Sequence, residues 1–246
     1  MPDLPALRRG CGAEPALLAR CAVVVFSALR TASAHAVFTS WEAGRSWPFV
    51  PDWMQALLPP PATVDGPTAE RTLNLIDVSA GETLRRFVDR VALDRRRARA
   101  HDHVPWDRVV DELREEGPVA EDASFRQSFV WDVSMGMALQ RHPRPDDPAA
   151  PLLSPVARYD WADFGFCWNM FLASREVIVI VASWDTAQMD VDEVERHCDC
   201  MADVMRRLAT EANWDRTIGD VFGARFDHGA NAGARYWETP EAAFSV

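Results

Sequence analysis

The 246-residue sequence contains no lysine, so its 26 basic residues are all arginines. A chain without lysine offers no residue for a Schiff-base mechanism or for a lysine general base. The 37 acidic residues give a formal net charge of −11, which argues against nucleic acid or an anionic membrane as the main partner. The five cysteines have no framework spacing, which favours buried thiols in a reducing, cytoplasmic compartment.

Long hydrophobic runs are also missing, and the apolar stretch from Cys21 to Leu29 is too short to cross a bilayer. The arginine pair at residues 8 and 9 and the small residues 31–34 make this region similar to a signal peptide. However, Arg20 directly precedes the apolar stretch and Arg30 directly follows it, which does not favour a signal peptide. We therefore predict a buried helix from Pro15 to Arg30, with the proline in its first turn.

The remaining pattern is an alternation of strands and helices. Strands are predicted over residues 35–41, 72–78 and 125–133, an antiparallel pair over 164–173 and 176–184, and a short helix over 106–115. Ser79 and Glu82 have the spacing of a capping box for a helix whose apolar stripe is Leu84, Phe87, Val88 and Val91. Together these predict an α/β (mixed α+β) fold, in which a mixed β-sheet is backed by helices.

The last predicted helix begins at Asp190, which forms a second capping-box pattern with Glu193. Its expected apolar stripe consists of Val191, Val194, Cys198, Met201, Met205 and Leu208. The adjacent His197, Cys198 and Cys200 suggest a metal site, but residues two apart on a helix point roughly 200° apart. The two cysteines therefore cannot face one ion, and we expect a helix with Cys198 buried and no metal.

Residue type alone gives three weak suggestions of chemistry. His101-Asp102-His103 could supply a general base or a metal ligand, although histidine is also favoured at a helix end. Ser124 or Ser134 could pair with one of these histidines, but neither has the Gly-x-Ser-x-Gly pattern of a nucleophile elbow. Two carboxylate pairs, Asp185 with Asp190 and Asp160 with Asp163, are equally typical of strand ends and helix caps.

Four short motifs carry more information through their order than through any one of them. An apolar helix precedes a strand that ends in Gly44-Arg45, and the segment HDHVPWD keeps the histidine, proline, aromatic and acidic positions of a His-Gln-Asp-x-Pro-Phe-Glu motif through His101, Pro105 and Trp106. Asp122 and Ser124 keep an Asp-x-Ser core that enters a strand, and a strand pair with a long helix closes the match. This order resembles the condensation domains of nonribosomal peptide synthetases.

The resemblance covers residues 15–222 and implies the C-terminal lobe of the chloramphenicol-acetyltransferase-like architecture. Residues 1–14 are unmatched, and the tail from 223 to 246 is expected to be poorly ordered. In that family an amine attacks a carrier-bound thioester, with phosphopantetheine arms entering a tunnel between two lobes. The implied partners are carrier proteins or the missing N-terminal lobe, and the implied cofactor is only the phosphopantetheine arm of a partner. The matched motif residues are expected to be structural or to line the tunnel wall.

The sequence also departs from the family. The active-site signature His-His-x-x-x-Asp-Gly is missing, and Glu70 stands roughly where another motif has an asparagine. The resemblance therefore implies a lobe with no catalytic residue of its own. Open alternatives are a non-enzymatic half-domain that binds carriers or synthetase subunits and self-associates through an apolar lobe face, a truncated remnant, and an acyltransferase of the same superfamily with His101 as base.

Overall fold

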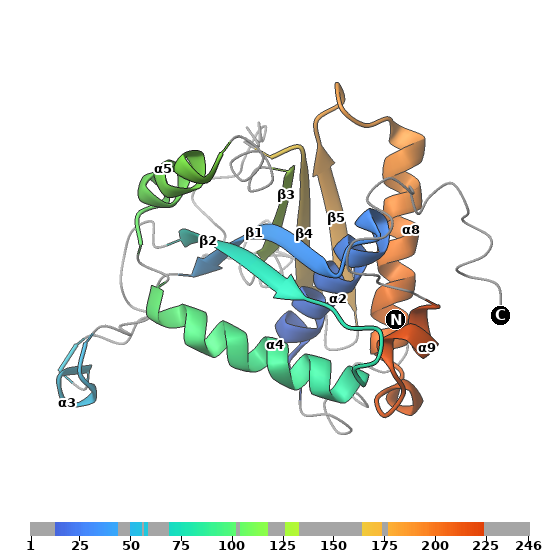
Figure 1. The fold of residues 1–246 in the computed structure, drawn as a ribbon, viewed down its shortest axis with the longest axis horizontal. Coiled ribbons are helices and arrows are strands. Elements are labelled where there is room, and N and C mark those ends of the chain that lie inside the picture. The colour runs from blue at the N-terminus through green and yellow to red at the C-terminus, as the bar shows by residue number, and fades with distance from the viewer. Residues whose placement is uncertain are drawn as a thin grey trace, which may run out of the picture.

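The computed structural model describes residues 13–43, 50–55, 57–58, 69–101, 104–117, 126–132, 164–173 and 177–223. Within them one mixed sheet has the spatial order β2-β1-β3-β4-β5 (Figure 1). The strands are β1 His35–Ala43, β2 Ala69–Asp77, β3 Gln127–Trp131, β4 Phe166–Leu172 and β5 Ile178–Trp184. The helices are α2 Pro15–Thr31, α3 Asp52–Gln55, α4 Leu84–Ala98, η2 Arg99–His101, α5 Trp106–Glu116, α8 Val191–Leu208, η3 Glu211–Asn213 and α9 Ile218–Phe222.

The middle of the sheet is parallel and its two outer strands are antiparallel to their neighbours. Strand β3 pairs in parallel with β1 and with β4, so that Ser128 lies between Thr39 and Cys167. The outer strands β2 and β5 pair antiparallel with β1 and β4 respectively. The predicted mixed sheet is therefore confirmed, as is the antiparallel pair near the end of the chain.

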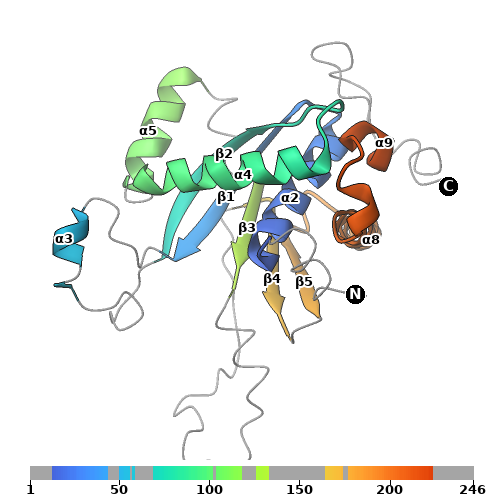
Figure 2. The same cartoon turned by 90° about the horizontal axis from the view of Figure 1, so that it is seen from below.

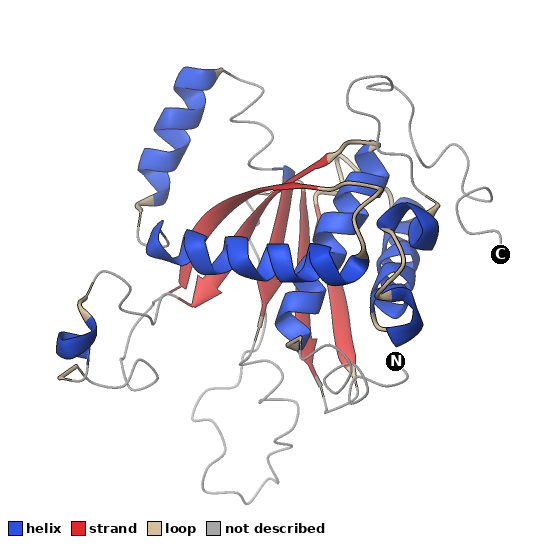
Figure 3. Cartoon of the chain, turned by 60° about the horizontal axis from the view of Figure 1, so that its bottom comes forward, coloured by secondary structure: helices blue, strands red, loops and turns tan. Residues whose placement is uncertain are grey.

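Helices α2, α4 and α8 pack on one face of this sheet (Figures 2 and 3). Helix α2 is buried at every position from Leu18 to Leu29, because it contacts the sheet on one side and helices α4 and α8 on the other. Its start at Pro15 confirms the expected buried helix. None of the helices in the described ranges is both long and apolar enough to span a membrane.

Helix α4 follows the prediction in its apolar stripe but not in its cap. Leu84, Phe87, Val88 and Val91 are all buried. The cap is Thr83, whose hydroxyl accepts a hydrogen bond from the Arg86 amide, so the capping box expected at Ser79 and Glu82 is wrong. Glu82 instead binds Arg90, eight residues further along the chain.

The last long helix, α8, is capped by Asp190 as predicted, with its Oδ1 2.7 Å from the Glu193 amide nitrogen. The expected stripe is partly wrong: Val191 is 55% exposed and Cys198 is only half-buried, whereas His197 and Val204 are buried. The carboxylate of Glu193 does not return to the cap, since it accepts a hydrogen bond from Arg30 of α2. The core also extends beyond Asn213, through Trp214, Ile218, Val221 and Phe222. Residues 224–246 of the expected tail, and residues 1–12, lie outside the described ranges.

Candidate functional site

One arginine brings together three aromatic side chains from three parts of the fold. The guanidinium carbon of Arg71 lies 4.5 Å from the ring centroid of Trp41, 5.6 Å from that of Phe164 and 5.9 Å from that of Trp106. All three distances are within the range of cation–π attraction. We call these four residues the Arg71 cluster.

The sheet and one helix start position the cluster. Trp41 and Arg71 are directly opposite each other in the antiparallel β1–β2 pair, where cross-strand side chains contact. Trp106 is the first residue of α5, and Pro105 before it takes an extended conformation that turns the chain into the helix. Phe164 is 4% exposed and lies just before β4. The cluster therefore joins β1, β2, α5 and the approach to β4.

Two of the sequence-predicted site residues lie at this cluster. Trp106 belongs to it, and Pro105 is the N-cap of the same helix. Strand β1 ends at Ala43, directly before Gly44 and Arg45, which lie outside the described residues together with Asp122 and Ser124. Trp41, Arg71 and Phe164 were not predicted. Only the β1–β2 register, which the sequence does not specify, would have placed Trp41 against Arg71.

The cluster can position a group but has no acid or base of its own. Its side chains are one guanidinium and three aromatic rings, none of which commonly serves as a general acid or base. His101 lies in η2, exposed, and its side chain makes no hydrogen bond or ion pair within the described residues. Its neighbours Asp102 and His103 lie outside the described residues. The described geometry therefore suits the cluster to bind a ligand or to stabilise the fold.

A second polar group lies between helices α2 and α8. Arg30 binds Glu193 at 3.1 Å, and His197 donates from Nδ1 to the Glu193 carbonyl oxygen at 2.6 Å. Burial lowers the pKa of His197, and the neighbouring Arg30 lowers it further. The His197 ring packs beside Phe26 and Phe166, so a neutral imidazole here belongs to the core. No three potential metal ligands come together anywhere in the described part of the chain.

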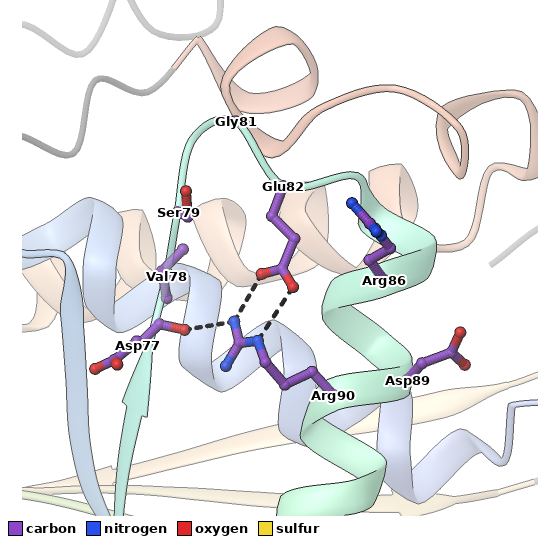
Figure 4. Close-up of a pocket in the computed structure, with 8 residues that line it drawn as sticks. All are labelled: Asp77, Val78, Ser79, Gly81, Glu82, Arg86, Asp89 and Arg90. Atoms are coloured by element: carbon purple, nitrogen blue, oxygen red, sulfur yellow. Dashed lines mark hydrogen bonds and ion pairs between the residues drawn. The ribbon is translucent and has the colours of Figure 1, made fainter.

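A third group lines an open pocket beside the start of α4 (Figure 4). Arg90 donates to both carboxylate oxygens of Glu82, at 3.1 and 2.7 Å, and to the backbone oxygen of Asp77 at 2.8 Å. The hydrogen bond that Arg90 donates to Glu82 raises the pKa of Arg90. These bonds hold the β2–α4 connection against the helix.

The carboxylate pair proposed at Asp185 and Asp190 is also structural. Asp185 follows β5 and accepts hydrogen bonds from the Ala187 amide and the Gln188 side chain, both at 2.9 Å. Asp190 caps α8. The second proposed pair, Asp160 and Asp163, lies outside the described residues, as does Ser134.

The comparisons with known proteins point to a half-domain. No protein-family model matches the sequence, and no curated relative was found. Similar solved structures include the first condensation domain of the CDA synthetase, with a TM-score of 0.56, 14% identity, and coverage of 87% of this chain and 43% of that chain. The X-domain from teicoplanin biosynthesis gives a TM-score of 0.61, 18% identity and coverage of 88% and 46%.

A four-domain nonribosomal peptide synthetase, bound to AMP and glycine, is similar over 94% of this chain and 17% of its own, with a TM-score of 0.64 and 15% identity. The chain therefore spans less than half the length of these three structures. The fold therefore belongs to the α/β class, with a mixed sheet and helices, and it corresponds to about half of a larger domain. More particularly, it has the fold of about half of a nonribosomal peptide synthetase condensation domain, as the motif order predicted.

Proposed function

We propose that this chain is the C-terminal lobe of a cytoplasmic condensation-type domain, which joins carrier-bound thioesters through an amide bond. The observation that carries the proposal is the coverage: 87% of this chain corresponds to 43% of the CDA synthetase condensation domain, and 88% corresponds to 46% of the teicoplanin X-domain. In this proposal the chain forms one wall of the tunnel for the phosphopantetheine arms. A second lobe supplies the catalytic histidine.

The order of the elements supports the same proposal. The motif positions at Pro105 and Trp106 start α5, and the strand expected to end in Gly-Arg is β1, which runs to the residue before Gly44. Both motifs thus converge on the Arg71 cluster, although they are far apart in the sequence. We assign the cluster to the tunnel wall, where a fixed cation and flat rings would hold a substrate arm without reacting with it.

The chain alone is proposed to be inactive. Its sequence has no His-His-x-x-x-Asp-Gly signature. Each histidine in the described ranges has a place that does not suit a general base. His35 is exposed at the start of β1 and pairs with Asp77, and the exposed side chain of His101 makes no bond within these ranges. His197 is buried against a backbone oxygen.

Reconstitution tests the proposal. The chain would be incubated with a donor and an acceptor carrier protein, each loaded as its thioester, with and without a separately expressed N-terminal lobe that contains the signature. We expect an amide product only when both lobes are present. Trp106→Ala should reduce the rate, while Arg206→Ala, on the exposed side of α8, should not.

Two results would decide against the proposal. Product formation by the chain alone, lost in His101→Ala, would establish the acyltransferase alternative. Carrier binding with no product in any combination of lobes would favour the alternative that the missing signature suggests, a non-enzymatic half-domain that binds carriers or synthetase subunits. The intact mass of the natural polypeptide, by immunoprecipitation and mass spectrometry, is an independent check: peptides of the signature within the same chain support a single two-lobed domain.

A further inference from the structure

Helix α5 carries an apolar groove that the rest of the described chain leaves open. None of its residues is buried, and it stands apart from the layer of α2, α4 and α8 (Figures 1 and 3). The groove has a volume of about 420 Å³ and is lined by Val104, Arg108, Val109, Glu112, Leu113 and Glu116. Three of these residues are apolar, two are glutamates and one is an arginine.

Helix α4 has the complementary surface. Leu93 is 39% exposed, although the opposite side of the same helix, with Phe87 and Val91, is fully buried. Arg86 and Arg97 lie seven positions before and four positions after Leu93, so all three share one stripe of the helix. Both arginines are exposed, and neither takes part in an ion pair with any residue that the structure describes.

The two helices carry opposite charge. From Leu84 to Arg99, seven arginines (85, 86, 90, 95, 96, 97 and 99) stand against two aspartates (89 and 94). From Trp106 to Glu116, five carboxylates (Asp107, Asp111, Glu112, Glu115 and Glu116) stand against two arginines (108 and 114). Within the described chain, ion pairs join α4 to Glu82 and to Asp215 rather than to α5.

We propose that two copies of this chain associate reciprocally, with α4 of each copy lying in the α5 groove of the other. Leu93 enters the groove beside Val109 and Leu113, while Arg86 and Arg97 face Glu112 and Glu116. A second copy is the occupant because both halves of the complementary pair belong to one chain. A two-fold axis then forms the contact twice, as a closed dimer requires. The groove lies on the same helix as Trp106 of the proposed tunnel wall, but Trp106 is not among its lining residues.

A charge swap is the sharpest test, and salt is a poor one. Salt screens the local attraction between the helices, but it also screens the repulsion between two chains that each carry a net charge of −11. Exchanging the partners avoids this ambiguity. Arg97→Glu lowers the net charge by two and Glu112→Arg raises it by two, so the double variant keeps the original net charge while restoring opposite charges across the contact.

The measurement is sedimentation velocity of the 246-residue chain over a concentration series. We expect a monomer–dimer equilibrium whose dissociation constant rises about tenfold in each single variant, since the reversed charge occurs twice in a symmetric dimer. The double variant should recover most of the loss. Arg196→Glu, an equal charge change on an exposed position of α8, is the control and should stay within about threefold of the original chain.

Leu93→Ser tests the apolar part of the contact separately and should also weaken the dimer. The proposal is overturned if the chain remains monomeric throughout the series. It is equally overturned by a dimer that ignores Arg97→Glu and Leu93→Ser, or by a double variant that associates no better than the single ones. Recovery in the double variant cannot come from misfolding, so it supports the contact directly.

Discussion

The Nη1 atom of Arg20 lies 2.7 Å from Oδ1 of Asn74 and connects the most buried helix to the edge strand β2. Both side chains are buried, and Asn74 also donates to the Phe38 carbonyl oxygen and to the Ser40 hydroxyl. The guanidinium lies about equally far from two rings, 6.0 Å from Phe38 and 5.9 Å from Phe129. An arginine in the middle of the core thus specifies how α2 meets the sheet.

Replacing Arg20 by methionine should destabilise the fold. The substitution keeps much of the side-chain volume but leaves the Asn74 oxygen without this donor, which costs about 2 kcal/mol of the free energy of unfolding. Urea denaturation measures the change. Arg206→Met is the matched control, because the exposed side chain of Arg206 pairs, among the described residues, only with Asp203 on α8 and should contribute about 0.5 kcal/mol or less. Equal losses in the two variants would contradict a structural role for the buried bond.

The corrected cap of α4 gives a second prediction. Thr83→Ala removes the hydroxyl that accepts from the Arg86 amide and should cost about 1 kcal/mol in thermal or urea unfolding. Ser79→Ala should be close to neutral, since Ser79 is exposed and its side chain caps nothing. If Ser79→Ala destabilised the protein more than Thr83→Ala, the cap would instead be Ser79, as the sequence predicted.

The buried imidazole between α2 and α8 should make stability depend on pH. Burial lowers the pKa of His197 below its ordinary 6.5, so the unfolded chain binds a proton more readily than the folded one. The free energy of unfolding should therefore fall as the pH is lowered from about 6.5 towards the folded-state pKa. His197→Leu should flatten this slope in urea titrations at several pH values. If the pH dependence of the free energy of unfolding were unchanged in the variant, titratable groups other than His197 would cause it.

The reactivity of the Cys200 thiol should report how well α8 is packed in the folded protein. Burial raises the pKa of Cys200 to about 11. At pH 8 the thiolate fraction is then about a hundredfold lower than in the unfolded chain, so alkylation by iodoacetamide should slow by at least that factor. Peptide mapping by mass spectrometry, with and without urea, measures both rates. Rapid alkylation of Cys200 in the folded protein would show that α8 opens readily.

The sequence predicted the regular elements well because their signals are local. The stripe of α4, the Asp190 cap of α8 and the proline start of α2 all depend on residues within one or two helical turns. The buried His197 and exposed Val191 were misjudged for a different reason. Which side of α8 is buried depends on where α2 packs against it, and the spacing of apolar residues alone does not specify that packing.

Contacts between distant segments account for the rest. Glu82 had a helix-cap spacing, but Arg90 provided a stronger, charge-assisted partner. The Arg71 cluster combines residues from β1, β2, α5 and the approach to β4, and no local pattern marks such a group. The order of short motifs predicted the fold nonetheless, because that order reflects the succession of elements along the whole chain.

The position of β3 in the sheet also has a consequence for how the protein is made. Its neighbours are β1 on one side, where Ser40 pairs with Phe129, and β4 on the other, which follows it along the chain. A growing polypeptide thus leaves the ribosome with one edge of β1 unpaired until β3, at Gln127–Trp131, has been synthesised. Such late, distant pairings slow folding and lengthen the time during which that edge can capture a wrong strand. A chaperone that shields this edge during translation would raise the yield of folded protein.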